Sequence, residues 1–157
     1  MPSLPKQRTR ALANQGTPVG AMRYSLYKQA YTRIAEASEQ GFHLEAISVI
    51  ESLVSDRLES RLSFLKGHDF SFKNLGPLIT EMRRLESDED LRKLVDQDLD
   101  EWRKSRNRAV HEMAKMADGD FSTWADRAKE LIPIGKKGLS CLRAIDKRYR
   151  ELRRLGR

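Results

Sequence analysis

Residues 102–116 read Trp-Arg-Lys-Ser-Arg-Asn-Arg-Ala-Val-His-Glu-Met-Ala-Lys-Met, and this stretch decides how the rest of the chain is interpreted. It continues a pattern of apolar residues at steps of three and four, which predicts one buried face of a long amphipathic helix. That face comprises Leu91, Val95, Leu99, Trp102, Ala109, Met113 and Met116. Position 106 falls on the same seam, and it holds Arg106. A guanidinium there needs an anionic partner or an opening to solvent, because it cannot lose its charge.

Two further polar residues follow this arginine on the same predicted helix. His111 comes five residues after Arg106, about 140° further round at 100° per residue, and Asn107 precedes His111 by one turn. Spacing alone leaves two interpretations open. One is an arginine that snorkels from the edge of the seam, beside a solvated histidine. The other is a functional pair of a phosphate-binding cation and a proton-transfer group.

The strongest helical pattern lies upstream, in residues 43–65. Its apolar face comprises Leu44, Ile47, Ile50, Val54, Leu58, Leu62 and Leu65. Gly67 follows Lys66 and predicts the end of this helix, because glycine adopts the left-handed conformation that ends many helices.

One carboxylate, Glu51, falls inside the apolar arc of this helix, whereas Glu45, Asp56 and Glu59 fall outside it. A buried carboxylate needs a cation or a hydrogen-bond donor. Because Arg106 also lies on an apolar seam, we expect the two to pair. The alternative is a local pair between Glu51 and Arg57.

The remaining segments also predict helices, and no alternation typical of strands persists anywhere. The expected bounds are 21–39, about 77–85 after a loop over 66–76, 87–117 for the long amphipathic helix, and 122–155, with Pro133 and Gly135 kinking or breaking the last of these early. Residues 1–20 contain prolines, glycines and basic residues and predict a flexible basic tail. The expected fold is therefore a tail followed by a single all-α domain over residues 21–157, an antiparallel bundle of about four to five helices.

Composition narrows the partners. The net charge is +7 over 157 residues, which favours a polyanion such as RNA. The single cysteine, Cys141, cannot form an internal disulfide, which fits the reducing cytoplasm. No segment is apolar and long enough to span a membrane, so we expect no membrane partner. His111-Glu112 begins like a zinc-protease motif, but Lys115 stands where the second ligand belongs. We expect neither a metal nor another cofactor.

The string Arg106-Asn107-x-x-x-His111 resembles the Arg-x(4–6)-His motif of HEPN domains, in which a polar residue commonly follows the arginine. The context is also similar, since the motif comes late in an all-helical chain, after a helix that carries Glu51 and a helix start at residues 75–79. The resemblance covers roughly residues 22–155, and it implies a HEPN-like bundle.

Many HEPN proteins are metal-independent endoribonucleases, so the resemblance implies a site made of Arg106, Asn107, His111 and Glu51. His111 would move protons, Arg106 would hold the scissile phosphate, Asn107 would orient the imidazole or the phosphate, and Glu51 would fix Arg106. The expected products are a 2′,3′-cyclic phosphate and a 5′-hydroxyl. Family membership implies a toxin or anti-phage role, and hence an antitoxin or other inhibitory partner.

The resemblance also implies a homodimer with a composite active site, because one chain supplies a single histidine to the motif. Of the seam residues, Trp102, Met113 and Met116 would suit such an interface. Two alternatives stay open at this point. One is a HEPN-like protein that binds RNA, a nucleotide or a protein without catalysis. The other is a helical interaction protein, such as half of a nucleotidyltransferase–HEPN pair, with Tyr149 as the modified residue.

Overall fold

The computed structural model describes residues 10–11, 16–68 and 72–157, and within these ranges the chain is helical with no strand. The helical segments are α1 (Pro18–Glu39), α2 (His43–Lys66), α3 (Leu75–Leu85), α4 (Glu89–Lys93), the π-helical η1 (Leu94–Leu99), α5 (Asp100–Glu112) and α6 (Trp124–Arg154). Because α4, η1 and α5 run on without a break, the described chain forms five helical rods. The predicted all-α bundle is therefore confirmed.

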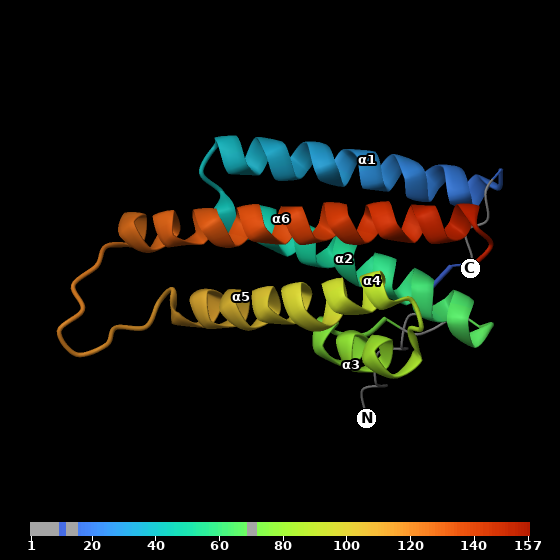
Figure 1. The fold of residues 1–157 in the computed structure, drawn as a ribbon. Helices are drawn as coiled ribbons and strands as arrows, with labels where there is room; N and C mark the ends of the chain where they lie inside the picture. Colours follow the sequence, from blue (N-terminus) through green and yellow to red (C-terminus); the bar gives the residue numbers. More distant parts are fainter. Residues whose placement is uncertain (1–9, 12–15, 69–71) are drawn as a thin grey trace, which may run out of the picture.

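The helices pack as an antiparallel bundle (Figure 1). In this view α6 lies between α1 and α5, with α2 behind it and α3 below. Helix α2 is the centre of the packing, because it contacts α1, α3 and α6. Large apolar side chains from α2, α3, α5 and α6 fill the core, including Ile47, Leu58, Ile79, Trp102 and Leu142. Burial of such side chains supplies most of the stability of a bundle of this kind.

Helix α2 matches its prediction closely. It begins at His43 and ends at Lys66, after which Gly67 has a φ of 73°. The N–H of Gly67 donates a hydrogen bond to the Ser63 carbonyl, so the left-handed residue closes the last turn. The helix that carries Glu51 is thus defined at both ends by its own sequence.

The predicted end of the long amphipathic helix is wrong. Helix α5 stops at Glu112 rather than at residue 117, and the segment from 113 to 123 crosses to α6. Arg127 of α6 donates hydrogen bonds to the carbonyls of Glu112, at 2.9 Å, and Met113, at 3.1 Å. Carbonyls that would otherwise lack a partner at the end of α5 are satisfied by this side chain instead of by further turns.

Of the kink or break predicted in the last helix, the break is wrong. Helix α6 runs without interruption from Trp124 to Arg154, with Pro133 inside it. Pro133 lies on the exposed side of the helix, so the Lys129 carbonyl that loses its donor faces water. A proline at such a position costs stability without ending the helix.

The N-terminal boundary also differs. Helix α1 begins at Pro18, earlier than the expected residue 21, because the Thr17 hydroxyl caps it by accepting a hydrogen bond from the Gly20 N–H. Most of the predicted flexible tail lies outside the described residues. Arg10 is described, and its side chain is buried against Asp56 and Glu59 of α2.

Candidate functional site

Arg106 and Glu51 form an ion pair that joins α5 to α2. The contact runs from Nη2 of Arg106 to Oε1 of Glu51, and both side chains are largely buried, with 17% and 29% of their surface exposed. The pairing expected from the two helical patterns is confirmed. The alternative partner, Arg57, instead contacts Asp146 of α6.

The Arg106 guanidinium has N–H donors that the ion pair with Glu51 does not use. A guanidinium has five N–H groups, and the ion pair engages Nη2. Its Nε is buried and has no hydrogen-bond partner among the described residues. A buried donor without a partner is costly, which favours a ligand oxygen or a water at this place.

The other two motif residues lie further toward solvent on the same helix. Asn107 is half-buried, and His111 is exposed in the last turn of α5. Within the described ranges no hydrogen bond or ion pair joins His111 to another side chain. The structure therefore brings Glu51 and Arg106 into contact and leaves His111 about one and a half turns away, open to solvent.

Trp102 anchors the helix that carries these residues. Its ring is fully buried, and its Nε1–H donates a hydrogen bond of 2.8 Å to the Ile134 carbonyl of α6. Gly138 of α6 makes this packing possible, because a Cβ at that position would lie 2.6 Å from the indole. Arg106 thus projects one turn beyond a point where α5 and α6 are fixed against each other.

The first turn of α5 is held by charges. Asp100 is buried and contacts Arg83 of α3 as well as Arg103 and Lys104 of its own helix. Burial alone would raise the pKa of Asp100, but the hydrogen bonds from Lys104, Arg103 and Arg83 outweigh it and lower that pKa to about 2. Together with Trp102, this carboxylate fixes α5 before Arg106.

The expected dimer surface needs correction. Trp102 and Met113 are buried in the core of the chain, so neither can contact a partner without unfolding its surroundings. Met116 alone of the three is exposed, because α5 ends before it. The large apolar side chains exposed between the end of α5 and the start of α6 are instead Met116, Phe121 and Trp124.

One acidic residue was misplaced by the helical pattern. Glu59, predicted outside the apolar arc of α2, is buried, because Arg10 from the N-terminal segment covers it. Burial raises the pKa of Glu59 above its ordinary value, which the Lys73 N–H and Arg10 only partly counter. The apolar pattern of α2 could not predict this contact, because Arg10 is a charged residue and lies far from Glu59 in the sequence.

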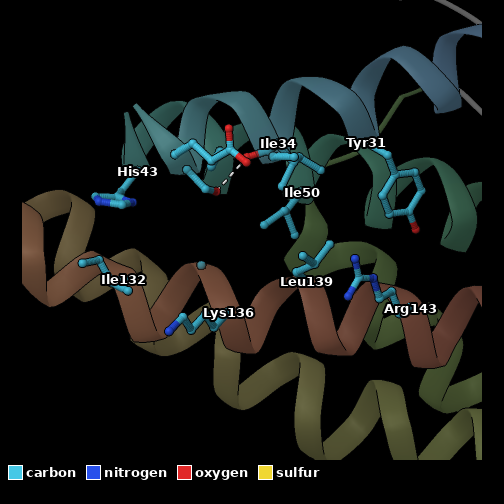
Figure 2. Close-up of a pocket in the computed structure, with 13 residues that line it drawn as sticks. Tyr31, Ile34, His43, Ile50, Ile132, Lys136, Leu139 and Arg143 are labelled. Carbon is cyan, nitrogen blue, oxygen red and sulfur yellow. Dashed lines mark hydrogen bonds between the residues drawn. The ribbon is translucent and has the colours of Figure 1, made fainter. Parts of the chain in front are cut away.

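The structure also contains two hollows, and neither Glu51 nor Arg106 lines them. The first is a cavity of about 450 Å³ between α1, α2 and α6. Figure 2 shows Ile34 and Ile50 on one side of this cavity and Leu139 and Lys136 on the opposite side. A second, of about 950 Å³, lies between the start of α1 and the end of α6. Sequence patterns predicted neither hollow.

The described residues contain no group of three or more His, Cys, Asp or Glu side chains placed to hold a metal ion. Among the described helices, none is both long and apolar enough to cross a membrane.

Comparison with known proteins found no match: no protein-family model, no curated protein and no solved structure is significantly similar to this chain.

Proposed function

We propose that this chain is a metal-independent endoribonuclease of the HEPN type, in which Arg106, Asn107, His111 and Glu51 form the active site. The observation that supports this most is the Glu51–Arg106 ion pair, which positions a guanidinium with donors to spare on the helix that ends in an exposed histidine. RNA carries its own nucleophile, the ribose 2′-hydroxyl. The protein needs only to move protons and to stabilise negative charge.

The chemistry assigns one role to each residue. The 2′-oxygen attacks the phosphorus, the bond from phosphorus to the 5′-oxygen breaks, and a proton passes from the 2′-hydroxyl to a base while the leaving 5′-oxygen receives one. His111 transfers a proton, because an imidazole can both accept and donate one and its side chain is open to RNA. Arg106 binds the phosphate and stabilises the charge of the transition state. Asn107 orients the phosphate or the imidazole.

The second proton-transfer group comes from a second copy of the chain. Neither of the other histidines lies on α5: His43 begins α2, and His68 follows its end. A two-fold axis near the end of α5 would place two copies of Arg106 and His111 in one cleft. Met116, Phe121 and Trp124 supply exposed apolar surface for this contact.

A heterodimer tests the shared site. Tagged wild-type chains are mixed with His111→Ala chains, and the mixed dimer is isolated and assayed. A shared site predicts loss of most cleavage, whereas independent sites would retain about half. A fully active monomer would contradict the composite site and leave the single-chain chemistry in place.

The biological role that we propose is that of a toxin or anti-phage effector. An unrestrained ribonuclease harms the cell that makes it, so this role requires an antitoxin or another inhibitory partner. The proposal rests on the resemblance of the motif and on the net charge of +7, which suits RNA.

The decisive experiment is incubation of the purified chain with RNA in EDTA, followed by analysis of the product ends. We expect cleavage that yields 2′,3′-cyclic phosphate and 5′-hydroxyl ends. Strict dependence on a divalent cation, or 5′-phosphate ends, would contradict the mechanism. Magnesium added back after EDTA serves as the control.

A second candidate follows from the same ion pair. Glu51 engages Arg106 directly, and no contact joins Arg106 to His111, which suits an arginine whose only role is to tie α5 to α2. The chain would then bind RNA without cleaving it. RNA that stays intact after prolonged incubation, while the protein retards it in a gel, would favour this candidate.

A further inference from the structure

The second hollow has the composition of a phosphate-binding site. It is lined by residues from the start of α1, from the end of α6 and by Arg57 of α2. Figure 1 shows the start of α1 and the end of α6 at the same end of the bundle. We call it the arginine pocket, because Arg23, Arg57, Arg150, Arg153 and Arg154 line it. No acidic side chain of the described chain lines this pocket.

Three of these arginines have no carboxylate partner in the described chain. Arg57 and Arg150 both contact Asp146, which neutralises one of the two charges. Arg23 donates only to the Ala11 carbonyl, Arg153 lies over the Tyr149 ring, and Arg154 has no partner among the described side chains. Unpaired guanidinium groups gathered in one hollow attract phosphate strongly.

The N-terminus of α1 adds to the positive potential of the arginine pocket. The first residues of the helix line the pocket, and the positive end of the helix dipole lies there. The helix dipole therefore adds to the attraction that the arginines exert on a phosphate group.

Tyr24 supplies an aromatic surface beside these cations. It lines the pocket, and 75% of its surface is exposed. Such a ring offers a base a platform for stacking, which tolerates any sequence because every base has a π-face. Tyr27, by contrast, is covered by Arg57, whose guanidinium lies 4.3 Å from the ring centroid.

We propose that the arginine pocket binds the phosphate backbone of single-stranded RNA, with one base stacked on Tyr24. The exposure of Tyr24 and Arg154 favours a strand that passes through, because pockets for free small ligands bury most of the ligand surface. The inference rests on the proposed function for the identity of the strand as RNA. It deepens that function by giving the substrate a second point of attachment.

The pocket lies far from His111. Arg127 contacts the end of α5, and from there to Arg153 the helix α6 rises by about 40 Å at 1.5 Å per residue. A strand held at both places would span most of the bundle. The pocket therefore contributes to affinity and to the choice of substrate, and it takes no part in the reaction.

The test measures binding without cleavage. The ligand is a 2′-O-methyl RNA of about twelve nucleotides, which cannot be cleaved because it lacks the 2′-hydroxyl nucleophile. The dissociation constant of its complex with each protein is measured at several salt concentrations. The test variant combines Arg23→Gln, Arg153→Gln and Arg154→Gln. The control variant combines Arg84→Gln, Arg92→Gln and Lys93→Gln, which removes the same charge from exposed positions on α3 and α4. Circular dichroism verifies that both variants fold.

We expect the test variant to lose at least about tenfold in affinity and the control variant to lose clearly less. The slope of log affinity against log salt should become shallower by about two in the test variant, since each phosphate contact on a single strand contributes about 0.7. Equal losses of affinity in the two variants, or no loss in either, would overturn the proposal that the arginine pocket binds RNA.

Two further measurements fix the ligand. Tyr24→Ala should weaken binding by on the order of tenfold, whereas Phe64→Ala, which removes an exposed ring from α2, should change it little. Adenosine triphosphate should compete only weakly with the RNA. Competition by the free nucleotide at the affinity of the oligonucleotide would overturn the assignment to a strand.

The two proposals fail in different ways. RNA that binds in the arginine pocket but is never cleaved would overturn the ribonuclease and leave the pocket intact. RNA that is cleaved with the same KM by the wild type and the test variant would overturn the pocket and leave the ribonuclease intact.

Discussion

The first turn of α5 and its last turn differ in the burial and in the hydrogen bonding of their side chains. At Trp102 the helix is buried, hydrogen-bonded to α6 and packed against a glycine that no other residue could replace without movement. At the other end the His111 side chain is exposed and makes no hydrogen bond within the described chain, although Arg127 of α6 donates to the carbonyls of Glu112 and Met113 beside it. Arg106 lies between them and is held from the side by Glu51.

This difference teaches how one helix can be both scaffold and site. In the proposed ribonuclease, a side chain that must reach RNA cannot be buried, yet it needs a position fixed to within a fraction of an ångström. Fixing the backbone at Trp102 and Asp100, and the guanidinium at Glu51, supplies that position while His111 stays open. Substitutions at these positions separate the scaffold from the proposed site.

The largest effect is expected at the exposed end. His111→Ala should lower the rate of RNA cleavage by about 10²–10⁴-fold, because it removes the proton-transfer group. Its melting temperature should stay near that of the wild type, since the side chain is exposed and makes no contact that stabilises the fold. His68→Ala, which changes an exposed histidine outside α5, is the control and should cleave normally. A His111→Ala protein that cleaves within threefold of wild type would reject His111.

Arg106→Lys should have the next largest effect. A lysine keeps the charge but loses the planar guanidinium that contacts phosphate at two points, so we expect about 10²–10³-fold slower cleavage. The measurement is the single-turnover rate at saturating protein. Arg108→Lys makes the same change at an exposed position of α5 and should leave the rate unchanged. Equal rates for both variants would show that Arg106 does not contact the phosphate.

The scaffold is tested at Gly138. Gly138→Ala places a Cβ 2.6 Å from the rigid indole of Trp102, so the two helices must separate, and we expect a loss of about 1–3 kcal/mol in the free energy of unfolding. Gly135→Ala changes another glycine of α6, whose Cβ would lie an ordinary 3.9 Å from Ile47. Because alanine favours helix, this control should gain up to about 1 kcal/mol. Urea denaturation measures both, and equal stabilities would show that the Trp102 contact is looser than described.

The same contrast explains which features the sequence could predict. The bounds of α2 and the Glu51–Arg106 pair follow from local periodicity, since both partners lie on apolar seams of their own helices. Periodicity does not predict that Glu59 is buried or that α6 continues through Pro133. It also does not predict which helix packs against Trp102. Each depends on which remote group packs there: Arg10 over Glu59, solvent beside Pro133, and Gly138 against the indole.

The proposed composite active site shows the same limit. Periodicity placed Trp102, Met113 and Met116 on one face, but it could not tell a face that contacts α6 from one that contacts a second chain. The structure assigns Trp102 and Met113 to the core and leaves Met116 exposed beside Phe121 and Trp124. The arginine pocket was likewise beyond prediction, because its residues come from three helices that the sequence does not order in space.

The smallest effect is expected where scaffold and site meet. Glu51→Ala removes the carboxylate that holds Arg106, and because both side chains keep some exposure the loss of stability should be on the order of 1 kcal/mol. Cleavage should fall with it, through a guanidinium that is no longer held in place, while Glu51→Gln should restore part of the rate by accepting a hydrogen bond. Glu45→Ala also removes a carboxylate from α2 and breaks an exposed pair with Arg33 of α1, and it should change neither quantity measurably. A Glu51→Ala protein with the melting temperature and cleavage rate of the wild type would mean that Arg106 is positioned by α5 alone, and that its contact with α2 matters to neither fold nor chemistry.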